Sequence, residues 1–128
     1  MRDELNLGNI DKAMYIVAKQ VFPQVYTGDR PKVNNSKPTA FCVVSLNGRL
    51  YDNLALGESI AKFSCFVREE ANGLENVDNK DKYISGLLKL LPCTIDNEYQ
   101  FFNPTVLPMG NDGKGFFQYV VYTNLIIE

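Results

Sequence analysis

Two stretches of the chain repeat apolar residues at the spacing of one helical face. The first covers residues 9–22, where Asn9 can cap a helix and Pro23 disfavours helical geometry in the residue before it. The second covers residues 78–91 and stops at Pro92, which cannot continue a helix. The apolar positions are Ile10, Ala13, Met14, Val17 and Val21 in the first helix, and Tyr83, Ile84, Leu87, Leu88 and Leu91 in the second.

Stretches rich in β-branched and aromatic residues fill much of the remaining chain. Asn47 and Gly48 separate two of them and predict a tight hairpin, because a type I′ turn needs positive φ at both central positions. The expected strands cover residues 39–46, 49–52, 59–69, 99–102 with 105–107, and 116–127. The element order is therefore α-β-β-β-α-β-β. It indicates one domain over residues 1–128, of the α+β class, with an antiparallel sheet and both helices packed on one of its faces.

The expected last strand, residues 116–127, is apolar on both faces, although two helices can cover only one. In the expected strand 59–69, Phe63, Cys65 and Val67 form one continuous apolar set, which predicts the face that meets the helices. The opposite face is then a candidate protein interface, because soluble monomers seldom expose a large apolar patch. Its candidate residues are Lys62, Phe66, Arg68, Val120, Tyr122 and Ile126.

A polar segment from Thr27 to Pro38 carries two prolines, one glycine and almost no apolar residue. A loop of this length is uncommon in a compact domain unless it is functional or disordered. We expect residues 28–38 to be mobile in the free subunit and to become ordered on assembly, since they cannot bury enough apolar surface to offset their ordering entropy.

Composition removes most kinds of chemistry. The 128 residues include no histidine, which is the commonest general base and metal ligand. The three cysteines, Cys42, Cys65 and Cys93, lack metal-ligand spacing and lie among apolar neighbours, so we expect buried, reduced thiols of no functional importance. The carboxylates lie where solvated acids or helix caps lie. We therefore predict no catalytic residue, no cofactor and no metal.

The charge pattern limits the partners. Thirteen basic residues are scattered among fifteen acidic ones, giving a net charge of −2, whereas binding a phosphate backbone takes a concentrated basic surface. The N-terminus lacks the apolar run of a signal peptide, and no window reaches the roughly 18 apolar residues of a membrane span. Neither nucleic acid nor a membrane is an expected partner.

In their order along the chain, these pieces resemble the tail terminator (tail-completion) family of long-tailed bacteriophages and prophages. The matching stretches are Phe41–Leu46, Gly57–Arg68, Asn72–Asn76, Tyr83–Leu91 and Asp112–Val121. Phe117 departs from the family pattern, which often has a histidine after the Gly-Phe of this last stretch. The resemblance implies a non-enzymatic ring, commonly hexameric, that caps the tail tube, contacts tube and head-neck proteins, and passes from the host cytoplasm into the virion tail.

Two other functions are compatible with the same residues. The helices could arch over a curved sheet and enclose an apolar pocket, which would make the chain a small-ligand binder. Alternatively, an enzyme could use a carboxylate or tyrosine mechanism, which would require an acid with a strongly shifted pKa in a pocket. An assembly protein should associate with itself, whereas a ligand binder should be a monomer with a cavity.

Overall fold

The computed structural model describes residues 7–28, 38–47 and 58–127. Two helices and six strands follow one another in these residues, in the order α1 (Leu7–Lys19), β1 (Val25–Thr27), β2 (Ala40–Asn47), β3 (Glu58–Arg68), α2 (Val77–Leu90), β4 (Cys93–Ile95), β5 (Tyr99–Asn111) and β6 (Phe116–Ile127). The strands form a single sheet in the order β1-β2-β3-β6-β5-β4. The α+β class is confirmed.

The sheet is mixed, so the expectation of a purely antiparallel sheet is wrong at one edge. β1 runs parallel to β2, with Tyr26 opposite Val43, while every other neighbouring pair is antiparallel. A three-residue strand carries too short a pattern to be predicted, and the contacts that fix its direction come from β2. The Gly28 N–H donates to the Val44 carbonyl, and the Cys42 N–H to that of Gln24.

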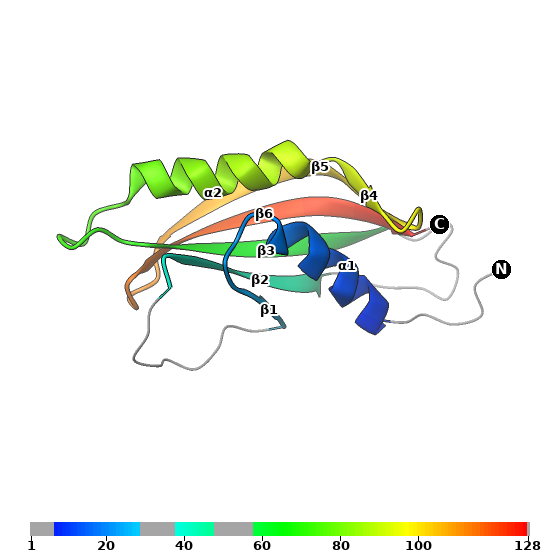
Figure 1. The fold of residues 1–128 in the computed structure, drawn as a ribbon, viewed down its shortest axis with the longest axis horizontal. Helices are drawn as coiled ribbons and strands as arrows, with labels where there is room; N and C mark the ends of the chain where they lie inside the picture. Colours follow the sequence, from blue (N-terminus) through cyan, green and yellow to red (C-terminus); the bar gives the residue numbers. More distant parts are fainter. Residues whose placement is uncertain (1–6, 29–37, 48–57, 128) are drawn as a thin grey trace.

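One face of the sheet forms a hydrophobic core with both helices (Figure 1). α1 crosses β1 and β2, and α2 runs roughly along the strands. The rings of Phe22 and Tyr83 stack at 5.3 Å between the segment after α1 and α2. Gly86 allows close approach, since a Cβ there would lie 3.1 Å from Val21 Cγ1. The fully buried members include Ile10, Met14, Val17, Leu87, Cys42, Phe63, Val121 and Leu125.

The helix boundaries follow local chemistry. α2 begins one residue earlier than predicted, and the Asn76 side chain caps it by accepting a hydrogen bond from the Asn79 N–H at 3.0 Å. α1 begins at Leu7, so the prediction that Asn9 caps it is wrong. It ends at Lys19, where the Gln20 and Val21 N–H groups turn to carbonyls three residues back.

Two predicted strands merge into the long β5. The expected break falls at Asn103, whose φ of 54° accompanies a register shift between Phe102 and Thr105. A bulge of this kind bends a strand without ending it. The predicted hairpin with residues 49–52 and most of the predicted mobile loop lie outside the described residues.

Candidate protein interface

The six residues predicted for an interface all lie on the face of the sheet opposite the helices. Paired residues on neighbouring strands point their side chains to the same side. Lys62 pairs with Tyr122, Ser64 with Val120, and Arg68 with Phe116, while Phe66 and Ile126 continue the same alternation. We call this surface the outer face. It comprises Phe41 and Val43 of β2, Ile60, Lys62, Ser64, Phe66 and Arg68 of β3, Thr105 and Leu107 of β5, and Phe116, Val120, Tyr122 and Ile126 of β6.

Part of the outer face is closed to solvent. Phe66 is only 5% exposed and Val120 only 1%. The Phe66 ring stacks on Phe41 at 4.6 Å, and Phe116 meets Phe41 edge-on at 5.1 Å. Together with Val43 these rings form a second, smaller core that Tyr26 flanks. The expectation of one continuous open apolar patch is therefore wrong at Phe66 and Val120.

The accessible part of the outer face lies farther along the strands. Lys62, Tyr122 and Ile126 are partly buried there, while the exposed Arg68 lies at the opposite end of β3, paired with Phe116. Two further apolar side chains on this face are open, Ile60 at 39% and Leu107 at 47%. Sequence reasoning left both out of the candidate set. The alternation along β3 already placed Ile60 on this face, whereas Leu107 required knowledge of the bulge.

The free edge of β5 is a poorer docking site than the outer face. β4 pairs only with Tyr99–Phe101, so the described residues leave the rest of β5 without an outer neighbour. The Asp112 N–H donates a hydrogen bond to the Phe116 carbonyl. The backbone N–H and C=O groups of the even-numbered residues of β6 therefore point toward β5. Pro108 pairs with the odd-numbered Tyr119, so its backbone nitrogen faces the free edge of β5, where proline has no N–H to donate. Pro104 lies in the bulge. Prolines at these positions oppose the addition of another strand.

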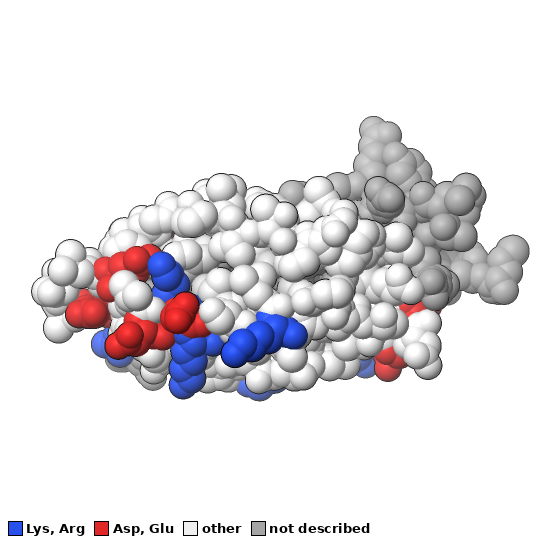
Figure 2. Space-filling model, turned by 90° about the horizontal axis from the view of Figure 1, so that it is seen from above, with Lys and Arg blue, Asp and Glu red and all other residues white. Residues whose placement is uncertain are grey.

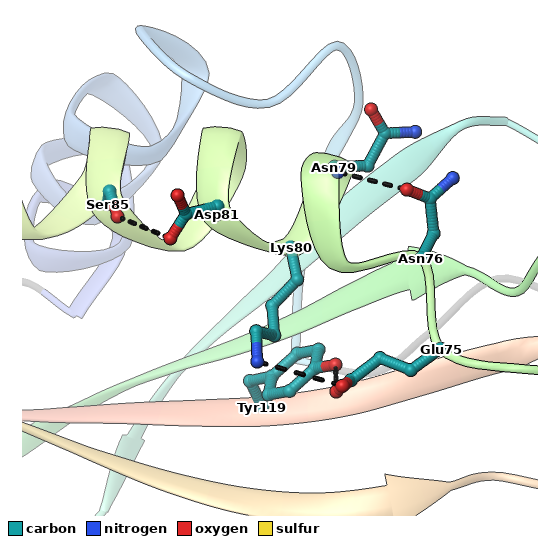
Figure 3. Close-up of polar contacts among 7 residues, drawn as sticks. All are labelled: Glu75, Asn76, Asn79, Lys80, Asp81, Ser85 and Tyr119. Carbon is teal, nitrogen blue, oxygen red and sulfur yellow. Dashed lines mark hydrogen bonds and ion pairs between the residues drawn. The ribbon is translucent and has the colours of Figure 1, made fainter.

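One polar cluster joins the start of α2 to the sheet (Figure 3). The Tyr119 hydroxyl donates a hydrogen bond to the Glu75 carboxylate. Lys80 Nζ lies 3.7 Å from Glu75 Oε1 and 5.9 Å from the centre of the Tyr119 ring. Glu75 precedes α2, Lys80 lies in α2 and Tyr119 lies in β6, so the cluster anchors the segment before α2 to β6.

The cluster holds Tyr119 in its protonated form. Desolvation by burial, then the hydrogen bond and charge of Glu75, raise the pKa of Tyr119 well above its usual range. A tyrosine that acts as a base or nucleophile needs the opposite shift, toward neutral pH. The arrangement therefore suits a structural anchor.

In the view of Figure 2, charged side chains of one sign do not gather into a separate patch. Acidic and basic side chains are intermixed at one end, and most of the remaining described surface in that view is uncharged. A nucleic-acid site would need basic side chains gathered on one face. In the described residues, no group of three or more cysteines, aspartates and glutamates could hold a metal ion, and neither helix is long and apolar enough to cross a membrane.

Two open hollows indent the described surface. One, between α1 and the turn before β5, is lined by Lys12, Ala13, Ile16, Asp96, Glu98 and Tyr99. The other, at the end of β3, is lined by Arg68, Glu69, Glu70, Ala71 and Gly115. Charged side chains contribute to both linings, whereas a small-ligand pocket is lined predominantly by apolar and aromatic side chains.

A scan against protein-family models and a search of curated proteins found no match to this chain.

Proposed function

We propose that this chain is a non-enzymatic structural protein of a phage or prophage particle, which acts as a tail terminator does. Copies of the chain form a ring, hexameric in the pattern that the resemblance implies. The ring caps the tail tube, ends its growth and presents a surface to the head-neck proteins. It assembles in the host cytoplasm and remains in the virion tail.

The observation that supports self-association is the accessible part of the outer face. Ile60 and Leu107 are exposed there beside the partly buried Tyr122 and Ile126. The helices already fill the other face, so no described element covers these side chains. Lys62 pairs with Tyr122 and borders them, and Arg68 lies at the other end of the outer face beside Phe116; both charges would set the register of a neighbouring copy by charge complementarity.

The non-enzymatic part of the proposal rests on the chemistry of the described residues. Burial and Glu75 raise the pKa of Tyr119, which keeps the proton on the phenol oxygen. Its neighbour Glu75 accepts that proton's hydrogen bond and also lies beside Lys80. A general base aimed at a substrate would instead face an open pocket.

Light scattering coupled to size-exclusion chromatography tests self-association. The parent chain should elute as an oligomer whose mass grows with concentration. The double variant Tyr122→Asp with Ile126→Asp should fold but shift to the monomer, because two buried charges would lack partners in the interface. Circular dichroism would verify that the variant is folded.

A matched control comes from the helix layer. Tyr15 and Ile16 are exposed apolar residues of α1, and their double aspartate variant makes the same chemical change away from the outer face. It should associate as the parent does. Loss of association in this control alone would move the interface to α1, and a parent that stays monomeric even with its tube protein would contradict the ring.

Electron microscopy tests the tail-specific part separately. Adding the chain to polymerising tail-tube protein should shorten the tubes and place density at one tube end. The outer-face double variant should lose this effect, while the α1 control should retain it. Tubes of unchanged length with the parent chain would contradict the terminator role, whatever its oligomeric state.

A further inference from the structure

Cys42 and Cys65 lie directly opposite each other on the neighbouring strands β2 and β3. Both thiols are reduced and fully buried in the core beneath the helices. The Cys65 thiol donates a hydrogen bond to the Phe63 carbonyl at 3.6 Å, and Cys65 lies close enough to Cys42 to help raise the pKa of the Cys42 thiol. Cys93 is also reduced, but it lies on β4 at the far edge of the sheet and is only partly buried.

The hydrogen-bond pattern gives this pair a specific geometry. The Arg68 N–H donates to the Thr39 carbonyl at 2.9 Å, so this pair of β2 and β3 residues is hydrogen-bonded. Hydrogen-bonded and non-hydrogen-bonded pairs alternate along two antiparallel strands. Cys42 and Cys65 are three pairs further along, so they form a non-hydrogen-bonded pair. The backbone of Cys42 agrees with this assignment, because its N–H donates to the Gln24 carbonyl, on the side of β2 away from β3.

Side chains approach each other most closely at non-hydrogen-bonded positions, where the two Cα atoms are about 4.5 Å apart. Disulfides span Cα separations of about 4.4–6.8 Å. The backbone therefore already holds the two cysteines at a distance that a covalent bond can bridge. Free thiols at a neighbouring hydrogen-bonded position would lie farther apart.

We propose that Cys42 and Cys65 are a reversible modification site, at which a small disulfide such as oxidised glutathione converts the two thiols into a cross-strand disulfide that joins β2 to β3. One thiolate attacks oxidised glutathione, forms a mixed disulfide and releases one reduced glutathione. The second thiolate then attacks the protein sulfur of the mixed disulfide and releases the other. Two protons and two electrons pass from the cysteines to glutathione.

The local environment makes the site slow to react and selective. Desolvation by burial, followed by the hydrogen bond and charge of Cys65, raises the pKa of the Cys42 thiol above its usual range. The thiolate is the attacking species, so exchange proceeds while the chain folds or when the strands open. The native register then retains the bond between these two sulfurs. This inference does not depend on the proposed ring.

An equilibrium measurement tests it without relying on the rate. The full-length chain is unfolded, reduced and refolded in glutathione buffers with an increasing oxidised fraction, and then trapped with acid. Peptide mapping should identify a single Cys42–Cys65 disulfide, with Cys93 free. The effective concentration of one thiol toward the other, measured from the disulfide equilibrium with glutathione, should be at least tenfold higher under native conditions than in concentrated guanidinium chloride.

Three variants sharpen the result. Cys93→Ser should form the disulfide at the same glutathione ratio as the parent, whereas Cys42→Ser and Cys65→Ser should remain without an intramolecular bond. An effective concentration in the folded chain no higher than in the unfolded chain would overturn the proposal. A dominant disulfide containing Cys93 in the parent would overturn it as well, even if either serine variant fails to fold.

Discussion

The two faces of the sheet use the same alternating strands differently. The inner face meets both helices, and its side chains form one continuous core with residues of α1, α2, β1, β2, β3, β5 and β6. The outer face closes only at one end, where aromatic rings of β2, β3 and β6 stack on one another. Farther along, the exposed Ile60 and Leu107 remain open. An apolar residue on a strand therefore says little about burial until its neighbours across the sheet are known.

The largest expected effect compares two phenylalanines on opposite faces of β3. Phe63 belongs to the inner core and Phe66 to the outer aromatic cluster, and both are buried. Each replacement by alanine should lower the free energy of unfolding by ~3–5 kcal/mol, because each leaves a cavity. Chemical denaturation measures both. A loss below ~1 kcal/mol for Phe66→Ala would show that the outer cluster does not act as a core.

A second comparison uses one substitution at two leucines. Leu87 of α2 is fully buried, whereas Leu107 on the outer face is about half exposed. Leu87→Ala should cost ~2–5 kcal/mol, and Leu107→Ala less than ~1 kcal/mol in the monomer. Urea unfolding at low protein concentration provides the values. Equal losses at the two positions would mean that the outer face is as tightly packed as the inner one.

The Tyr119 anchor predicts a smaller effect that depends on pH. Tyr119→Phe should cost ~1–2 kcal/mol near neutral pH, the range of a hydrogen bond to a partly exposed charged group. The folded chain raises the pKa of Tyr119, so it binds this proton more tightly than the unfolded chain. The stabilisation is complete below the ordinary tyrosine pKa of about 10 and is lost as the pH rises above it.

Unfolding measured from pH 8 upward checks the sign. The difference in stability between the parent and Tyr119→Phe should shrink above pH ~10. Tyr122→Phe is the matched control, because Tyr122 lies on the same strand but on the outer face. Comparing the two variants separates the loss of the Glu75 contact from the loss of a phenol hydroxyl on β6. A Tyr119 difference that grows with pH would contradict the assignment of the proton to the phenol.

The smallest change in stability is expected at the edge of β5. Pro108→Thr supplies an outward N–H and should alter the free energy of unfolding by less than ~0.5 kcal/mol, as surface substitutions usually do. It should nevertheless promote association through strand addition, visible as larger species in light scattering. Lys114→Thr, in the exposed turn after β5, is the control. An unchanged mass for Pro108→Thr would show that the proline does not protect the edge.

Local chemistry made much of the fold predictable. The period of the apolar residues placed α2 within one residue of its observed ends and β6 at its observed bounds. Alternation along β3 separated Phe63, Cys65 and Val67 from Phe66, and the structure places the first three in the main core. The burial of Cys42 and Cys65 was predicted from their apolar neighbours and is confirmed.

The candidate site was less predictable, because its properties depend on strands far apart in the sequence. Alternation assigned Lys62, Tyr122 and Ile126 to a common face, and the register confirms that placement. It could not show that Phe66 is closed by Phe41, or that the bulge after Phe102 turns Leu107 outward on the same face. Whether the outer face binds another copy stays a prediction.

The class of the fold, the two faces of each long strand and the absence of histidine chemistry could be read from the sequence, because they follow from local periodicity and composition. The order of the strands, the parallel pairing of β1 and the pairing of Cys42 with Cys65 depend instead on the folded arrangement of the chain. Each of these requires two segments to meet across a loop. Many pairings satisfy the same local pattern, and the one adopted is selected by packing among residues distant in sequence.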